Sequence, residues 1–283
     1  MLPKNKERID ILLTEKQLCD TRTTAQKLIR AGKVRVKGQI VDKPGTLVSL
    51  DSIIEVESEP PFVSRGGEKL IKAIASFNIE VKGRICLDGG ISTGGFTDCL
   101  LQQGAKKVYG VDVGYGQVAW KIRQDERLTL LERTNFRHLT PEKLYQGETP
   151  ADLGVMDLSF ISLTKVLAKL WELLITPRDV ILLVKPQFEV GKEKVGKNGV
   201  VRDYRLQAEA INQVLRHALE IGWQYQNLTY SPITGPAGNI EYLLWLSEDI
   251  NNVNPTLEQI EQLTKSSQKE IKNGSITSRR VNY

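Results

Sequence analysis

The 283-residue sequence has few of the residues that staple small proteins together, with three cysteines and two histidines. Cys19, Cys86 and Cys99 stand at unrelated spacings, so neither a disulfide framework nor a structural zinc site is expected. We expect no metal. A chain of this length buries enough apolar surface to fold without such supports.

Long hydrophobic runs are also missing. The longest runs, such as residues 180–184 and 242–246, fall far short of the roughly 20 apolar residues that span a bilayer. The first ten residues, MLPKNKERID, contain several charged side chains and lead into no apolar signal-peptide core. We therefore expect a cytoplasmic protein without a membrane partner.

The positive charge is concentrated near the N-terminus. The formal net charge is +5, but residues 1–48 hold 11 Lys and Arg against five acids, or +6, which leaves about −1 elsewhere. A basic surface of this kind is typical of proteins that bind phosphates, and a solvated face that only aids solubility is the alternative. The cations that we expect to contact RNA are Arg22, Lys27, Arg30, Lys33, Arg35 and Lys37.

The pattern around these cations predicts a small α+β domain. Residues 23–31 have helical spacing and end at Gly32, and alternating apolar residues predict short strands in 34–56. The string RAGKVRVKGQIVDKPGTLV resembles the RNA-binding domain first named for the fourth small-subunit ribosomal protein, over about residues 6–56. That resemblance implies recognition of structured RNA through phosphate contacts and shape.

Two prolines divide the chain. Pro60 and Pro61 follow an acidic stretch and prevent helices and strands from continuing. We predict an RNA-binding domain over 1–59, a linker over 60–66, a second domain over 67–248 and a polar C-terminal tail over 249–283. The tail contains one helical stretch around residues 257–271.

The second domain alternates strand-like and helix-like segments. This order predicts an α/β, Rossmann-like fold with a mostly parallel sheet covered by helices on both faces. A hairpin formed by residues 228–231 and 240–246 predicts an antiparallel last strand at one edge. The parallel strands are expected at 85–88, 107–112, 128–132, 151–157 and 179–185.

A glycine-rich turn follows the first of these strands. It matches neither the dinucleotide pattern nor the phosphate-loop pattern, and Asp112 ends the next strand, where a ribose diol would lie. A nucleoside cofactor without a pyrophosphate fits best, and S-adenosylmethionine is the common one; a merely tight turn is the alternative. The expected cofactor residues in and before this turn are Asp88, Gly89, Gly90, Ser92, Thr93, Gly94, Gly95 and Phe96.

Longer strings carry a closer resemblance. The sequence is similar to the TlyA family in SRGGEKL, LDGGISTGGFTDCLLQQGAKKVYGVDVGYGQ, ERTNFR, MDLSFISL, VKPQFEVG and GNIEYLLWL. This family carries a hemolysin name but groups with the FtsJ-type ribosomal RNA methyltransferases. The resemblance covers nearly the whole chain. It implies transfer of a methyl group from S-adenosylmethionine to a ribose 2′-hydroxyl of ribosomal RNA, with cytidine as the implied nucleotide.

The same resemblance implies a catalytic tetrad of Lys69, Asp157, Lys185 and Glu241. Lys185 is expected to orient and deprotonate the hydroxyl, with Asp157 and Glu241 orienting Lys185. Lys69 is expected to hold the target ribose or phosphate. Asp157 and Lys185 also end adjacent predicted strands, where sites of α/β proteins lie. Each of these residues alone has an ordinary structural alternative, such as a surface lysine or a turn-capping aspartate.

Further residues are expected around this centre. Asp88 is assigned to the methionine moiety, Asn135 to the adenine, although asparagine often forms turns, and Arg65 to RNA. Phe160 and Phe188 are candidates to stack on a flipped nucleotide, or to pack in the core. The basic segment 190–202 is either a mobile loop over RNA or a solvated connection. Two other functions stay open, a non-catalytic ribosome assembly factor and a membrane-active hemolysin.

Overall fold

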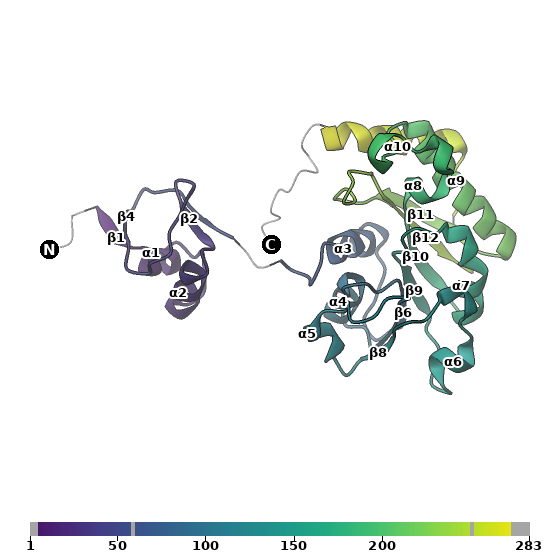
Figure 1. Ribbon diagram of the computed structural model, residues 1–283, viewed down its shortest axis with the longest axis horizontal. Helices are drawn as coiled ribbons and strands as arrows, with labels where there is room; N and C mark the ends of the chain where they lie inside the picture. Colours follow the sequence, from purple (N-terminus) through teal and green to yellow (C-terminus); the bar gives the residue numbers. More distant parts are fainter. Residues whose placement is uncertain (1–4, 58–59, 250–251, 273–283) are drawn as a thin grey trace. The chain divides into compact units, whose positions relative to one another are not determined.

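The computed structural model describes residues 5–57, 60–249 and 252–272. The chain forms two compact units, Met1–Pro60 and Pro61–Tyr283 (Figure 1). No helix among the described residues is both long and apolar enough to span a membrane.

The first unit packs two helices against short strands. Its core is formed by Ile9 and Leu13 of the first helix, Ala25 and Ile29 of the second, and Val34. Strands β1 and β4 pair antiparallel, and β2 lies between β3 and β5. The elements are β1 (Lys6–Arg8), α1 (Ile9–Glu15), α2 (Arg22–Arg30), β2 (Val34–Val36), β3 (Gln39–Ile40), β4 (Leu47–Ser49) and β5 (Ile54–Val56).

The second unit is built on a seven-stranded sheet in the order β11-β12-β10-β9-β6-β7-β8. β12 runs antiparallel to both of its neighbours, β10 and β11, and the other neighbouring strands pair in parallel, so the predicted Rossmann-like fold with an antiparallel last strand is confirmed. The edge strand of the hairpin is β11, not the last strand β12. The strands are β6 (Ile85–Gly89), β7 (Lys107–Val111), β8 (Leu128–Leu131), β9 (Leu153–Met156), β10 (Asp179–Val184), β11 (Gln224–Tyr230) and β12 (Tyr242–Ser247).

Helices cover both faces of this sheet (Figure 1). Side chains alternate along a strand, so Ile181 and Leu183 of β10 face α3 and α4, whereas Leu182 faces α7 and α9. The helices are α3 (Gly66–Phe77), α4 (Gly95–Gln102), α5 (Trp120–Arg123), α6 (Pro141–Tyr145), α7 (Leu167–Leu173), α8 (Pro186–Glu189), α9 (Tyr204–Ile221) and α10 (Leu257–Lys272).

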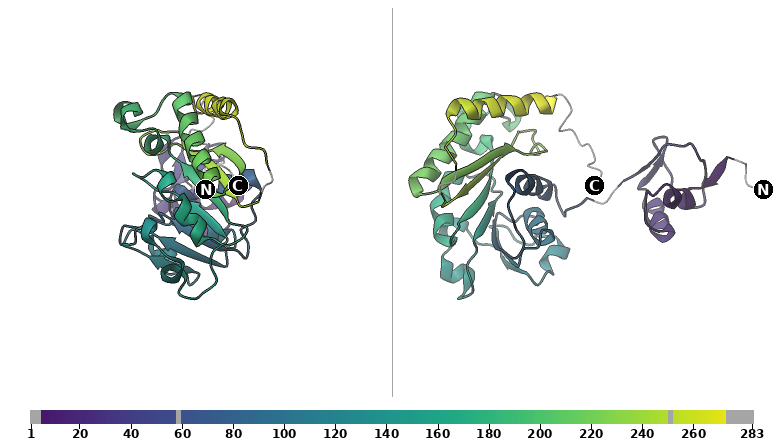
Figure 2. Two further views of the ribbon diagram at one scale, coloured as in Figure 1. Left: turned by 90° about the vertical axis from the view of Figure 1, so that its right-hand side faces the viewer. Right: turned by 180° about the vertical axis from the view of Figure 1, so that it is seen from behind.

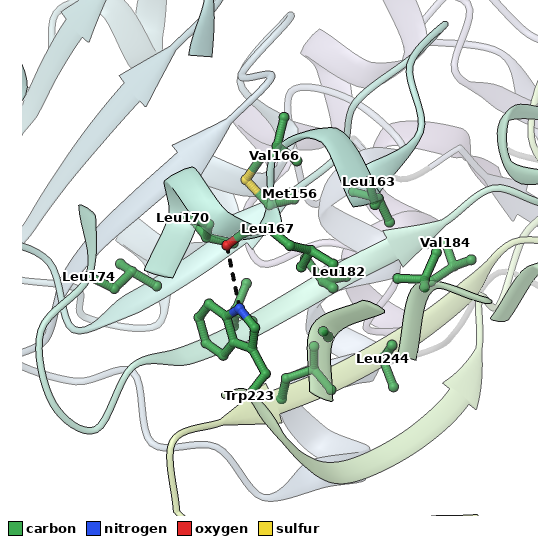
Figure 3. Packing of buried hydrophobic residues seen from close by; sticks show 14 of the residues in the cluster. Met156, Leu163, Val166, Leu167, Leu170, Leu174, Leu182, Val184, Trp223 and Leu244 are labelled. Carbon is green, nitrogen blue, oxygen red and sulfur yellow. Dashed lines mark hydrogen bonds between the residues drawn. The ribbon is translucent and has the colours of Figure 1, made fainter. Parts of the chain in front are cut away.

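Figure 3 shows a polar anchor in the core on the α7 side. Trp223 is fully buried and donates its indole N–H to the backbone carbonyl of Leu167, at 3.4 Å. Since a buried indole N–H needs an acceptor, this bond fixes the start of β11 against α7.

The two ends of the second unit differ from the prediction. Within the expected linker 60–66, Phe62 is buried, and the backbone N–H of Val63 donates to Asp98 of α4 at 2.8 Å. Within the expected tail 249–283, α10 packs along α9 (Figure 2). Ile260 of α10 is buried in this contact. Both segments therefore belong to the folded unit, while 250–251 and 273–283 lie outside the described residues.

Candidate active site

The four residues of the predicted tetrad meet at one edge of the sheet, the edge formed by the carboxyl ends of its parallel strands. Asp157 follows β9 and Lys185 follows β10, which are parallel neighbours. Glu241 precedes β12, whose first residue pairs with the last residue of β10, so Glu241 and Lys185 extend adjacent strands at the same edge. Lys69 lies in the first turn of α3. Parallel strands end together at this edge, which is where α/β proteins bind ligands.

Lys185 is held by the loop that follows β9. Its ammonium lies 2.6 Å from Oδ1 of Asp157 and donates to the hydroxyl of Ser159 at 3.0 Å. The Lys185 side chain is 9% exposed and that of Asp157 is 23% exposed. The amine is thus directed by two acceptors, and Asp157 is the more exposed partner of the ion pair.

Lys69 forms a second ion pair, with Glu241. The distance from Nζ to Oε2 is 2.6 Å, and the side chains are only 10% and 2% exposed. The prediction that Glu241 orients Lys185 is therefore not what the structure shows, because its carboxylate is engaged by Lys69. Asp157 alone of the two acids pairs with Lys185.

A cavity of about 200 Å³ opens between α3 and the glycine-rich turn. Lys69 and Asp157 lie in its wall, so the two ion pairs border one space. The remaining lining residues come from the segment before α3, from the glycine-rich turn and its helix, and from one proline of the β11–β12 connection: Ser64, Arg65, Gly66, Gly90, Ile91, Ser92, Thr93, Gly95, Phe96 and Pro236.

The glycine-rich turn needs glycine for two physical reasons. Gly90 has φ +86°, and a Cβ there would lie 2.8 Å from the carbonyl oxygen of Asp157. Gly94 has φ +95° and directly precedes α4 as its N-cap. Asp112 fixes the turn from β7, since its carboxylate accepts the backbone N–H of Ser92 at 2.8 Å and that of Gly114 at 2.7 Å. The turn therefore brings its backbone close to the ends of β6 and β9.

Asp88 is the buried acid behind this turn. One carboxylate oxygen accepts the hydroxyl of Thr97 at 2.7 Å, and Oδ1 has no partner. Burial raises the pKa of Asp88 to about 7, with smaller contributions from the charges of Asp157 and Asp112, and the Thr97 bond opposes the rise.

These features fit S-adenosylmethionine. An unpartnered buried carboxylate oxygen is costly, and a cationic group of a ligand would supply the missing partner. A turn without side chains, beside the free N–H groups of a helix start, accommodates a ligand at close range. Asp88, Asp112 and the turn would hold the cofactor.

Asn135 makes a local contact in a turn. It is exposed and caps a 3₁₀ turn, where its side-chain oxygen accepts the backbone N–H of Arg137 at 3.1 Å. Its assignment to the adenine remains a prediction, and the turn-forming alternative describes the contact that is present.

The loops after β9 and β10 make contacts that sequence reasoning missed. Glu189, the last residue of α8, accepts the hydroxyl of Ser162 at 2.5 Å and the backbone N–H of Leu163 at 2.9 Å. Burial raises the pKa of Glu189, and these two hydrogen bonds oppose the rise. The aromatic rings of Phe160 and Phe188 lie 5.3 Å apart. The sequence offered one signal for Glu189, because this acid stands between the apolar residues Phe188 and Val190 in QFEVG.

The predicted RNA-binding cations of the first unit lie on α2 and the β2–β3 hairpin. Arg22, Lys27, Arg30 and Lys37 are exposed, while Lys33 and Arg35 are half-buried. Arg22 contacts the buried carboxylate of Asp10 at 3.0 Å, so its role is at least partly structural. Arg65 is exposed and belongs to the cavity wall of the second unit.

The basic segment 190–202 is anchored. Asn239 accepts the backbone N–H of Val201 at 2.9 Å and donates to the carbonyl of Gly199 at 2.8 Å. The segment forms two 3₁₀ turns, Lys192–Lys194 and Lys197–Gly199.

Among the described parts of the chain, no group of three or more His, Cys, Asp or Glu is arranged to hold a metal ion.

Comparisons with known proteins agree with this geometry. Residues 62–248 match the FtsJ-like methyltransferase family, and residues 7–54 match the S4 domain. The chain is 49% identical over 243 residues to the 16S/23S rRNA (cytidine-2′-O)-methyltransferase TlyA of Mycobacterium tuberculosis, covering 85% of this chain and 90% of that protein.

Two further relatives extend the match. The chain is 41% identical to Hemolysin A of Brachyspira hyodysenteriae, covering 83% of this chain and 98% of that protein. A solved structure of a provisionally named hemolysin from Streptococcus thermophilus is 39% identical and has a TM-score of 0.73, covering 96% of this chain and 99% of that one. The chain therefore belongs to the TlyA family, in which an S4 domain precedes an FtsJ-like methyltransferase domain.

Proposed function

We propose that the protein transfers a methyl group from S-adenosylmethionine to the 2′-hydroxyl of a cytidine in ribosomal RNA. The observation that carries the proposal is the pair of lysine–carboxylate contacts beside one cavity, next to a glycine-rich turn suited to the cofactor. The name of the Mycobacterium tuberculosis relative supports the substrate class. We place the protein in the cytoplasm, with ribosomal subunits as its partner.

The chemistry needs positioning and a route for one proton. Bound S-adenosylmethionine supplies an electrophilic methyl group on a sulfonium. The protein must then hold the ribose hydroxyl in line and remove its proton. Asp157 and Ser159 fix the direction of the Lys185 side chain. An ammonium has no lone pair, so Lys185 takes the proton of the hydroxyl only as the neutral amine, after it has released one proton of its own.

Lys69 and Glu241 support the same centre from α3 and β12. Their mutual contact holds the first turn of α3 against the sheet edge. Since Lys69 also lines the cavity, it remains able to contact a ribose or phosphate there. Arg65 lines the same cavity and is the RNA contact that we propose within this unit.

Phe160 is the proposed stacking residue for the target nucleotide. Its side chain is 92% exposed, which is unusual for a ring of this size. Enzymes that act on an unstacked nucleotide commonly read it against an aromatic face. Phe188 of α8 packs against Phe160 and supports it.

The first test concerns the cofactor. We expect calorimetry on the purified protein to show binding of S-adenosylmethionine and weaker or no binding of nicotinamide adenine dinucleotide, because the glycine-rich turn lacks a pyrophosphate cradle. Labelled methyl groups should then pass to ribosomal subunits. Tighter binding of the dinucleotide would refute the cofactor assignment, and binding without transfer would favour a non-catalytic assembly factor.

A second test separates the tasks of the two units. Changing Arg30, Lys33 and Arg35 to glutamine should weaken RNA binding. The slope of the logarithm of the binding constant against the logarithm of the salt concentration should become less negative by about 0.7 to 0.9 per lost phosphate contact. Affinity for S-adenosylmethionine should stay unchanged. RNA affinity is measured over a series of salt concentrations.

The matched control removes the same charge elsewhere. Changing the exposed residues Lys82, Lys106 and Lys143 of the second unit to glutamine should leave most of the salt slope in place. If the two triple variants bind RNA alike at every salt concentration, the basic residues of the first unit form only a solvated face.

A further inference from the structure

Three residues of the segment after β10 contact the loop after β9. Lys185 contacts Asp157 and Ser159, Phe188 packs on Phe160, and Glu189 accepts hydrogen bonds from Ser162 and Leu163. The contacts of Lys185 and Phe188 lie where substrate would bind, and Phe160 is almost fully exposed. Of these contacts, the hydrogen bond between Glu189 and Leu163 is buried at both ends, because Glu189 is 6% exposed and Leu163 is 2% exposed. Lys185 is also buried, but the side chain of its partner Asp157 is 23% exposed.

The loop after β9 needs such an anchor. Phe160 has φ +65°, a left-handed conformation that bulky residues rarely adopt. A strained backbone of this kind persists only where surrounding contacts hold it in place. The exposed ring contributes little packing of its own, so the restraint must come from residues on either side of Phe160.

Glu189 provides this restraint on the far side of Phe160. Its two carboxylate oxygens accept separate donors, the hydroxyl of Ser162 at 2.5 Å and the backbone N–H of Leu163 at 2.9 Å. Hydrogen bonds to an ionised acceptor are stronger than neutral ones, and more so away from water. Without the carboxylate, the buried N–H of Leu163 would lose its acceptor.

We propose that Glu189 is a positioning residue for methyl transfer, which fixes the loop of residues 157–163 so that Asp157 stays against Lys185 and Phe160 stays against Phe188 in a constant arrangement. The inference rests on the proposed function. Glu189 itself does not line the cavity, so it acts through the residues that it holds.

The test compares three variants with the parent protein. Glu189→Ala removes both acceptors. Glu189→Gln retains the contacts, because its amide oxygen can accept from Leu163 and its NH₂ can donate to Ser162, whose hydroxyl then turns to Thr164 at 2.8 Å. Glu193→Ala is the matched control, since Glu193 is an exposed glutamate shortly after Glu189.

Two measurements are made on each variant. For Glu189→Ala we expect kcat for methyl transfer to fall roughly 10- to 100-fold, the range for a displaced catalytic arrangement, with the Kd for S-adenosylmethionine unchanged. Amide hydrogen exchange should accelerate in residues 157–165 and stay constant in 85–105. Glu189→Gln and Glu193→Ala should resemble the parent in both measurements.

The outcomes separate the proposal from its alternatives. Parental kcat or parental exchange in Glu189→Ala would overturn the proposal. Equal loss in Glu189→Gln and Glu189→Ala would show that charge, not positioning, matters. Loss of cofactor binding together with kcat would indicate a general structural role. If the parent transfers no methyl group, the proposed function is wrong, and the exchange comparison still decides whether Glu189 holds the loop.

Discussion

Replacing Lys185 with alanine should lower the rate of methyl transfer by about 10²-fold or more, the usual cost of losing a positioned acid–base group. The fold should persist, because Asp157 is 23% exposed and water can solvate its carboxylate once the ammonium is gone. Cofactor affinity should also persist, since Lys185 does not belong to the glycine-rich turn. The measurements are single-turnover transfer to ribosomal RNA, thermal unfolding and calorimetry.

Arginine at the same position distinguishes a base from an electrostatic anchor. A guanidinium keeps its proton at neutral pH and cannot deprotonate a hydroxyl, so Lys185→Arg should fail as Lys185→Ala does. Lys106→Ala is the control, because Lys106 is exposed and precedes β7. It therefore lies where the parallel strands begin, at the end of the sheet away from the site. Near-parental transfer by Lys185→Arg would show that Lys185 contributes only charge.

Breaking the other ion pair should affect stability as well as activity. Lys69→Met leaves Glu241 as a buried carboxylate without its partner, and this typically costs about 3–5 kcal/mol of unfolding free energy. The pair is buried on both sides, with side chains 10% and 2% exposed. Urea unfolding of the parent and the variant gives the difference.

The double variant Lys69→Met/Glu241→Leu should recover most of this stability, because apolar side chains of similar size often replace a buried ion pair without loss. Methyl transfer should not recover. Lys194→Met is the control, since Lys194 and Glu209 form an ion pair 3.0 Å long with side chains 46% and 50% exposed, worth about 1 kcal/mol or less. Equal destabilisation by Lys69→Met and Lys194→Met would contradict the energetic importance of burial here.

The sequence was sufficient to predict the sheet and the edge at which the site lies. Strands and helices alternate strongly, and Asp157 and Lys185 each end an apolar run, so the topology of α/β folds brings them together. The pairing of Lys69 with Glu241 could not be predicted, because they lie 172 positions apart. Which of two nearby acids meets which lysine depends on side-chain directions that spacing alone does not determine.

Two helices show another limit of sequence reasoning. The short helix α1 was not predicted, although Ile9, Leu12 and Leu13 have helical spacing and are buried together. Helix α10 was predicted as a helical stretch of a polar tail. It packs through Ile260 and also buries the polar Thr264, whose hydroxyl donates to the backbone carbonyl of Tyr204 at 2.9 Å. A polar composition conceals burial where hydrogen-bond partners come from distant elements.

The position of the transferred methyl group tests the central claim most directly. Ribosomal RNA is incubated with the purified protein and S-adenosylmethionine labelled in the methyl group, then digested to nucleosides and analysed by mass spectrometry. The proposed function predicts label in 2′-O-methylcytidine. The arrangement of Lys185, Asp157 and the cavity predicts the absence of this label after reaction with Lys185→Ala. Label on a nucleobase, or equal labelling by Lys185→Ala, would contradict ribose methylation organised by Lys185.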